Sequence, residues 1–260
     1  MSFRRFTVGA ALTVFGFYAL LIASLGYFFD PGEVAQVWGS ERTLFTIKLS
    51  MTAATLAASA AMMLAIPAAY ALSRFEFTGR LVADTILEFP IIVSPAALGA
   101  ILLIFFNNPL GEWIQEHLIT FVFAFAGIVL AQFVTILGIA TRLVKTALDE
   151  IPDEYERVAR SLGASPLRAF ATITLPLARR GMFTAFVLAW AKALGEFGAT
   201  ITVAGTMAMR TETLPVAIYM RLSGADIEGT VAMIILLLTI GLGSLFLVRW
   251  ASRRRVHAPS

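Results

Sequence analysis

Six long apolar stretches constrain the fold of this chain more than any other feature of its sequence. They cover residues 8–29, 45–72, about 81–106, 121–144, 182–204 and 231–250. A helix rises about 1.5 Å per residue and needs roughly 20 apolar residues to cross about 30 Å of hydrocarbon. The stretches therefore predict an all-α membrane protein with six transmembrane helices. No long Pro-, Ser- or Gly-rich linker divides them, so we expect a single transmembrane domain over residues 1–260.

The composition agrees with a protein of the lipid bilayer and excludes several other classes. Charged residues make up 14% of the chain, against about 25% in a soluble domain. The absence of cysteine excludes disulfides, thiolate metal sites and a cysteine nucleophile. His117 and His257 are too far apart in sequence to suggest a metal centre. We therefore expect no metal site and no catalytic residues.

The third stretch differs from the others because Asp84, Glu88, Pro90 and Pro95 crowd its first half. Proline removes a backbone hydrogen-bond donor and commonly kinks a membrane helix. We therefore expect this span to be bent or broken between Pro90 and Pro95.

The distribution of basic residues predicts the orientation in the membrane. With six spans both termini lie on one side, and cytoplasmic loops are richer in Lys and Arg. The termini and the loops at 72–82 and 142–180 hold 15 of the 20 basic residues. We therefore expect a multi-pass protein of the cell (inner or cytoplasmic) membrane with both termini in the cytoplasm. Membrane insertion alone explains the basic cluster Arg253, Arg254 and Arg255, so we expect no nucleic-acid binding.

The 142–180 loop contains a helical pattern. Its apolar positions are Tyr155, Val158, Ala159 and Leu162, while Glu156 and Arg157 fall on the opposite, charged face. Asp153 is placed to cap the start of this helix. Gly163 is placed to end it, because glycine takes the positive φ of a helix C-terminus without penalty.

A second short helix follows this glycine. Ser165 fits its N-cap, Pro166 its first position and Phe170 its apolar face, and Pro176 is expected to end it. The two helices together predict a rigid helical elbow. The pattern alone fits a helix lying on the membrane surface and a docking site for another protein equally well.

The spacing of the elbow resembles a motif in the cytoplasmic loop of ABC importer permeases. That motif is Glu-Ala-Ala, three residues, Gly, nine residues, then Ile-x-Leu-Pro. The matching positions here are Ala159, Gly163, Ile173, Leu175 and Pro176. Arg157 and Val158 replace the first Glu and Ala, although Glu156 lies one residue earlier. The resemblance implies a type I ABC importer permease fold with a coupling-helix loop at about 145–180.

In such permeases the elbow docks in a groove on a separate ATPase subunit. The resemblance implies the ATPase-coupling residues Glu156, Arg157, Ala159, Gly163, Ala164, Ser165 and Pro166. The chain has no G-x-x-x-x-G-K-[ST] phosphate loop. We therefore expect it not to be an enzyme and to bind no cofactor itself, with ATP and Mg on the partner ATPase.

The fifth stretch carries two charges within the membrane. Lys192 and Glu196 lie four residues apart, so they share a helix face and can neutralise one another. Charges inside a span usually face a bundle interior or a watery cavity. The pair is compatible with an ion pair that only fixes packing and with a direct role in the pathway. Gly195, Gly198 and Ala199 predict a close helix approach.

Two segments look like the molybdate and tungstate branch of these permeases. They are Gly-Glu-Phe-Gly-Ala-Thr at 195–200 and Thr-Glu-Thr-Leu-Pro-x-Ala-Ile-Tyr at 211–219. Sulfate permeases have a related Gly-Glu-Phe segment but lack the Leu-Pro-x-Ala-Ile-Tyr continuation. The resemblance implies the permease subunit of an ATP-driven importer for an oxyanion, in first place molybdate or tungstate. A sulfate or thiosulfate permease is the alternative.

The resemblance also implies the partners: a second copy of the chain, two ATPase subunits and an extracytoplasmic substrate-binding protein. We expect the third and fifth spans to form the gate, with pathway candidates Ser94, Pro95, Lys192, Glu196, Thr200 and Thr202. A self-contained secondary transporter or channel is less favoured, because no repeat relates the two halves and the Lys192–Glu196 pair is the one candidate for ion coupling. A membrane enzyme is disfavoured because neither histidine lies deep in a span.

Overall fold

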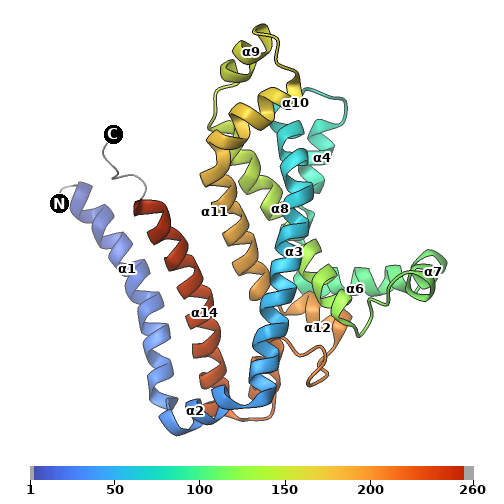
Figure 1. Cartoon of the computed structure of the whole chain (residues 1–260). Coiled ribbons are helices and arrows are strands. Elements are labelled where there is room, and N and C mark those ends of the chain that lie inside the picture. The colour runs from blue at the N-terminus through green and yellow to red at the C-terminus, as the bar shows by residue number, and fades with distance from the viewer. Residues whose placement is uncertain (1–2, 255–260) are drawn as a thin grey trace.

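The computed structural model describes the backbone of residues 3–254 and the side chains of residues 3–246. Every regular element in this range is helical, which confirms the all-α prediction (Figure 1). The elements are α1 (Phe3–Ser24), η1 (Leu25–Phe28), α2 (Pro31–Gly39), α3 (Glu41–Arg74), α4 (Arg80–Ile86), α5 (Phe89–Ile92), α6 (Pro95–Phe106), α7 (Pro109–His117), α8 (Phe125–Asp149), α9 (Glu154–Ser161), α10 (Pro166–Ala169), η2 (Phe170–Thr174), α11 (Leu175–Leu194), α12 (Gly198–Ala204), α13 (Leu214–Ser223) and α14 (Ile227–Arg254).

Six spans result when each bent pair of helices is counted as one. Four unbroken spans are long and apolar enough to cross a bilayer: α1 with η1, α3, α8 and α14 up to Phe246. The other two are pairs of helices bent by 110° and 57°. The chain is thus a multi-pass membrane protein, as the apolar stretches predict.

The sequence predicts the bend in one of the two bent spans but not in the other. The 110° bend lies between α5 and α6, where Ser94 caps α6 and Pro95 is its first residue. This confirms the predicted break between Pro90 and Pro95. The 57° bend separates α11 from α12, although the apolar stretch 182–204 was expected to form one span. Gly195 and Glu196 lie at this second break.

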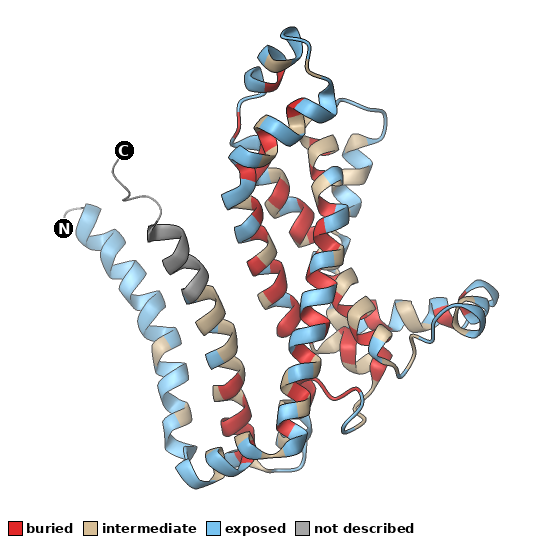
Figure 2. Ribbon diagram, in the orientation of Figure 1, coloured by how far each residue is buried: buried red, intermediate tan, exposed pale blue. Residues whose placement is uncertain are grey.

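The core of the molecule lies between α3, α8 and α11, which pack against one another (Figure 2). Alanine residues make this close approach possible. On α3 a stripe of fully buried alanines faces α8 and α11, and its members include Ala54, Ala57, Ala58, Ala61, Ala65 and Ala69. Small side chains let membrane helices approach closely, where dispersion contacts stabilise them.

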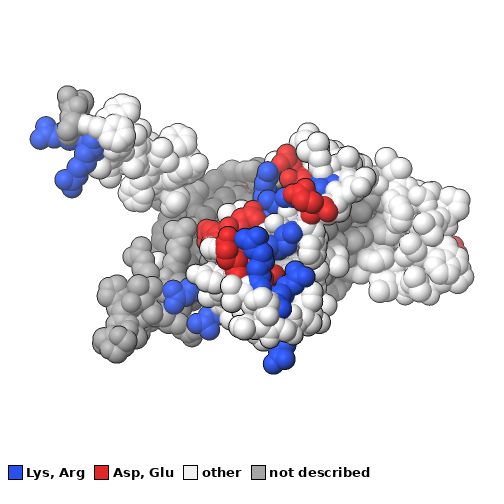
Figure 3. All heavy atoms as spheres, turned by 90° about the horizontal axis from the view of Figure 1, so that it is seen from above, with Lys and Arg blue, Asp and Glu red and all other residues white. Residues whose placement is uncertain are grey.

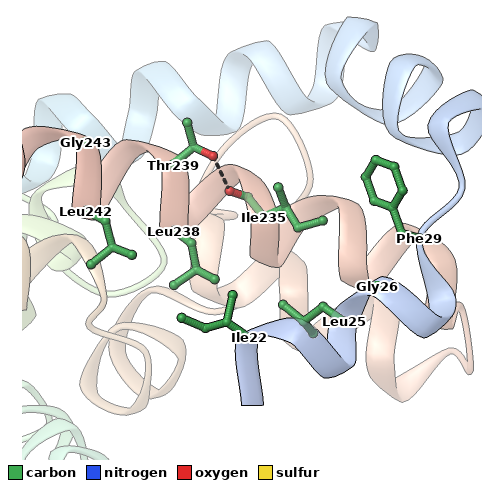
Figure 4. A pocket seen from close by; sticks show the side chains of 9 residues that line it. All are labelled: Ile22, Leu25, Gly26, Phe29, Ile235, Leu238, Thr239, Leu242 and Gly243. Carbon is green, nitrogen blue, oxygen red and sulfur yellow. Dashed lines mark hydrogen bonds between the residues drawn. The ribbon is translucent and has the colours of Figure 1, made fainter. Parts of the chain in front are cut away.

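α1 stands apart from this core and has no buried residue. Its last turn and η1 lie against α14, and α2 links it to α3 (Figure 1). An apolar pocket of about 360 Å³ lies between α14 on one side and the end of α1 with η1 on the other (Figure 4). Its lining residues include Leu25, Leu238 and Leu242.

The start of α1, the end of α14 and the elbow helix α9 lie at the same end of the molecule (Figure 1). Seen from that end, Lys, Arg, Asp and Glu side chains gather over the elbow (Figure 3). Placing this end in the cytoplasm stays a prediction. The side chains of Arg253 and Arg254, together with Arg255 and His257, lie outside the described residues.

Candidate coupling elbow and gate

The elbow has the two-helix form that the sequence predicts. α9 ends at Ser161, and Gly163 follows with φ +92°. At the start of α10, the Oγ of Ser165 accepts a hydrogen bond from the backbone N–H of Arg168 (3.3 Å), and Pro166 is the first residue. These three predictions are confirmed. Ala159 and Ala164 are half-buried.

The predicted cap at Asp153 is wrong. Asp153 has a helical backbone conformation and makes no side-chain cap hydrogen bond. Its carboxylate instead pairs with Nη2 of Arg157 (3.2 Å), which also lies 2.9 Å from Oε1 of Glu154. The helical backbone explains the missing cap, because a capping side chain needs a non-helical backbone to reach the N–H groups of the first turn.

Pro176 was predicted to end the second helix, and this is also wrong. α10, η2 and α11 form one continuous helix from Pro166 to Leu194. η2 is a π turn, in which the N–H of Leu175 donates to the carbonyl of Phe170 five residues back. The π turn shifts the hydrogen-bond register directly before Pro176, so the proline sits in the first turn of α11, where its missing N–H is tolerated.

The apolar face of α9 is exposed in this chain. The exposed fractions are 54% for Tyr155, 58% for Val158 and 84% for Leu162. α9, which carries them, lies at the end of the molecule, away from the apolar spans (Figure 1). A row of three large apolar side chains there is typical of a surface that another protein covers.

Glu156 was predicted on the charged, exposed face, and this is wrong. Only 7% of the residue is exposed. Its carboxylate accepts hydrogen bonds from the hydroxyl of Tyr70 (2.7 Å) and from the hydroxyl of Thr174. The pattern within α9 gave no sign of this, because the partners lie on α3 and in η2. Arg157 is on the exposed surface, as predicted.

At the other end of the core, the second halves of the two bent spans pack against each other. α6 and α12 meet at two glycines. A β-carbon added to Gly99 would lie 2.7 Å from Cβ of Thr202, and one added to Gly198 would lie 2.8 Å from the backbone nitrogen of Ala96. The same β-carbon on Gly198 would lie 3.0 Å from Cβ of Pro95. The structure therefore brings the predicted gate residues Pro95 and Thr202 to one helix contact, beside the exposed Ser94.

The predicted Lys192–Glu196 pair is present, with Nζ 3.3 Å from Oε2. The two side chains have different surroundings: the side chain of Glu196 is 1% exposed and that of Lys192 is 46% exposed. The second oxygen of Glu196 accepts a hydrogen bond from the N–H of Ala199 (3.1 Å). Glu196 therefore links α11 to α12 across the 57° break, while the ammonium group of Lys192 keeps further donors available.

The two threonine candidates differ from each other. The hydroxyl of Thr202 donates to the carbonyl of Gly198 (2.7 Å), one turn back on α12. This is the back-bonding common for threonine in membrane helices. Thr200 is fully buried, and its hydroxyl has no hydrogen-bond partner among the described residues.

The 211–219 segment is held firmly by α3. Glu212 is buried and makes a two-pronged ion pair with Arg42, with distances of 2.5 and 2.7 Å. The N–H of Leu214 donates to the Oγ of Ser50 (2.8 Å). These contacts give Glu212 and the start of α13 a structural role, whereas the buried hydroxyl of Thr213 has no hydrogen-bond partner among the described residues.

A further contact, which joins the first half of the third span to α8, was not predicted from the sequence. A β-carbon on Gly138 would lie 2.1 Å from the carbonyl oxygen of Leu87, and Glu88 forms an ion pair with Arg142. Gln132, also on α8, is fully buried with both amide atoms unpaired among the described residues. A lone glycine or glutamine in an apolar run carries no sequence signal for such contacts.

A protein-family model described as a binding-protein-dependent transport system inner membrane component matches residues 61–257. The chain belongs to this family. It is therefore an ABC importer permease, as its elbow motif indicates, and not a self-contained transporter.

Curated relatives of the permease include two molybdenum transport system permease proteins. ModB of Haemophilus influenzae is 34% identical over 213 residues, which cover 80% of this chain and 93% of ModB. ModB of Escherichia coli K12 is 34% identical over 214 residues, with 80% and 92% covered. The sulfate transport system permease protein CysW of E. coli K12 is 33% identical over 252 residues, with 94% and 86% covered.

Solved structures show the same fold. The permease matches a chain of a bacterial ABC transporter that imports the acidic polysaccharide alginate, with a TM-score of 0.77, 19% identity and 96% of each chain covered. It also matches a chain of an amino acid ABC transporter with a TM-score of 0.58, 17% identity and 82% of this chain and 94% of that chain covered. The type I ABC importer permease fold is thereby confirmed.

Proposed function

We propose that this permease forms the membrane pathway of an ATP-driven importer for molybdate or tungstate. Its similarity to two ModB permeases over most of both chains carries the proposal. The segments at 195–200 and 211–219, which set this branch apart in the sequence, support it. In the structure, residues 195–200 form the break before α12 and its start, and residues 211–219 pack against α3.

The gate of the pathway is the contact of α6 with α12. Both are short helices that follow a break in a span, so each can tilt while the unbroken spans α3 and α8 keep their place. The candidate residues are Ser94, Pro95, Lys192, Glu196, Thr200 and Thr202. Lys192 is the group best suited to meet the anion, because its half-exposed ammonium can donate to oxyanion oxygens while one contact to Glu196 holds it.

The permease works with three kinds of partner. A second copy completes the pathway, an extracytoplasmic binding protein delivers the anion, and two ATPase subunits bind ATP and Mg. The elbow, with its exposed Tyr155, Val158 and Leu162, lies on the cytoplasmic side and docks on the ATPase. Both termini are cytoplasmic, and the whole chain acts as one transmembrane domain.

The substrate is tested by reconstituting the permease in lipid vesicles with its ATPase and its binding protein. ATP hydrolysis is measured with molybdate, tungstate or sulfate at equal concentrations. We expect molybdate or tungstate to stimulate hydrolysis more strongly than sulfate. Stimulation by sulfate alone, or equal stimulation by all three anions, would contradict the molybdate assignment.

Sulfate is the second candidate, and the similarity to CysW over 94% of this chain favours it. The three anions are all tetrahedral and doubly charged, so hydroxyl and ammonium donors bind each of them in the same way. Repeating the measurement with the binding protein of a sulfate importer separates the candidates. Stimulation by that pair would assign the permease to sulfate.

A further inference from the structure

Glu156 is a buried carboxylate in an otherwise exposed helix. It lies in the first turn of α9, and side chains from two other elements, α3 and η2, surround it. Tyr70 of α3 donates to one carboxylate oxygen (2.7 Å), Thr174 of η2 donates to the other, and Nε of Arg74 lies 3.6 Å from the second oxygen. Tyr70 also packs its ring on that of Phe170, with centroids 4.7 Å apart.

Arg74 extends this cluster to α8. Its Nη2 donates to the carbonyls of Leu148 (3.0 Å) and Ile151 (2.7 Å), at the end of α8 and directly after it. A guanidinium at this position satisfies carbonyls that the helix end leaves without partners, and it complements the helix dipole. Ser73 adds a second tie, since its hydroxyl donates to Oδ1 of Asp149 (2.5 Å). The ends of α3 and α8 are therefore joined to each other and, through Arg74, to Glu156.

Arg157 and Glu154 provide the contrast on the same helix. Both side chains are more than half exposed, and Arg157 pairs with Glu154 and Asp153 inside one turn of α9. Such exposed pairs contribute little and connect no other element. A buried carboxylate, in contrast, is stable only when its partners satisfy it, so removing those partners leaves an unpaired charge in the interior.

We propose that Glu156, Tyr70, Thr174 and Arg74 form a buried anchor that makes the elbow move as one body with the ends of α3 and α8. The proposal rests on the proposed docking of α9 on an ATPase. Glu156 is then a positioning residue, and the docking contact belongs to the exposed face of α9. Without the anchor, a push on α9 would bend the loops at 150–153 and 163–165 and would not reach the spans.

The experiment compares variants in the reconstituted complex of permease, ATPase and binding protein. We expect Glu156→Ala to keep the ATPase bound and hydrolysing ATP, but to lower the anion transported per ATP by about tenfold, since a buried charged contact is lost. Tyr70→Phe removes one hydrogen bond to the carboxylate and should lower the same ratio by about fivefold. Glu154→Gln is the matched control, an exposed carboxylate on the same helix, and should leave the ratio unchanged.

A second readout reports the anchor independently of transport. The chain has no cysteine, so Ser161→Cys at the exposed end of α9 takes a single nitroxide label. We expect the label to be restrained in the parent chain and in Glu154→Gln, and mobile in Glu156→Ala and Tyr70→Phe.

Two results would overturn the anchor. One is loss of ATPase binding in Glu156→Ala with an unchanged label spectrum, which would make Glu156 a docking residue. The other is unchanged transport per ATP in both variants. If the parent chain binds no ATPase at all, the proposed function fails, and the label spectrum still decides whether Glu156 holds α9.

Discussion

The elbow consists of two helices joined at a break, and the gate consists of two helices, α6 and α12, that each follow a break in a different span. The two regions are held together in different ways. At the elbow, Gly163 takes a positive φ in open space, and the buried contacts are polar, around Glu156. At the gate, Gly99 and Gly198 leave no room for a β-carbon, and the contact is largely backbone against backbone. The elbow therefore depends on the backbone conformation at Gly163 and on the buried charge of Glu156. The gate depends on the lack of side-chain volume at Gly99 and Gly198.

This difference has a practical consequence for substitutions. The elbow should tolerate added volume at Gly163 but not a change of backbone conformation. The gate should tolerate no added volume, whatever the conformation. Variants at the two places therefore separate the two kinds of constraint.

The largest effect is expected at the elbow. Gly163→Pro should abolish ATP-driven uptake while the protein still inserts in the membrane, because proline fixes φ near −65° and Gly163 needs +92°. Gly163→Asn is the control, since asparagine tolerates the left-handed region, and it should keep most of the uptake. Uptake and membrane yield are measured together. Unaltered uptake in Gly163→Pro would remove the coupling role of the elbow.

A somewhat smaller effect is expected at the gate. Gly99→Val should lower the free energy of unfolding by about 3 kcal/mol and reduce uptake, because overpacking a tight contact displaces backbone. Gly16→Val is the control on α1, where a β-carbon meets nothing within 4 Å. Thermal unfolding in detergent and uptake in vesicles check both variants. Equal stability of the two would show that the α6–α12 contact is looser than described.

The Lys192–Glu196 pair should separate fold from transport. Glu196→Ala should lower the free energy of unfolding by about 2 kcal/mol, because the buried N–H of Ala199 loses its acceptor. Lys192→Met should lower it by a similar amount, about 2 kcal/mol, since the fully buried carboxylate of Glu196 loses its charged partner, and should reduce uptake further than Glu196→Ala does. Normal uptake in Lys192→Met would leave the pair a packing feature only.

The smallest effect is expected at Thr200. Its buried hydroxyl has no partner among the described residues, so Thr200→Val removes an unsatisfied polar group of nearly the same shape. Stability should stay within about 1 kcal/mol or rise slightly. A loss of uptake at unchanged stability would show that the hydroxyl meets the anion during transport.

The same comparison explains how much the sequence could predict. The turn of the elbow is local: Gly163, Ser165 and Pro166 act through their own backbone, and all three predictions are confirmed. The prediction that Pro176 ends the second helix was wrong because the π turn Phe170–Thr174 comes directly before it. The proline therefore lies in the first turn of α11. The prediction that Glu156 is exposed was wrong because its burial depends on Tyr70, which lies 86 positions away in sequence.

At the gate, the proline-marked break of the third span was predictable and is confirmed. The break of the fifth span was not, because glycine in an apolar run fits close packing and a bend equally. The close helix approach predicted at Gly198 and Ala199 is confirmed, whereas a β-carbon on Gly195 would meet only its own helix. The sequence could not show that Gly99 on α6 is the partner. That requires the relative placement of α6 and α12, which no local pattern encodes.

The central claim is that this chain is a permease driven by a separate ATPase through its elbow. Purification of the tagged chain from its native membrane, with identification of the proteins that accompany it, tests this most directly. We predict a stable ATPase subunit that is lost when Val158 and Leu162 on the exposed face of α9 are replaced by Asp. Purified chain that alone moves the anion down an ion gradient, with no ATPase bound, would contradict the claim.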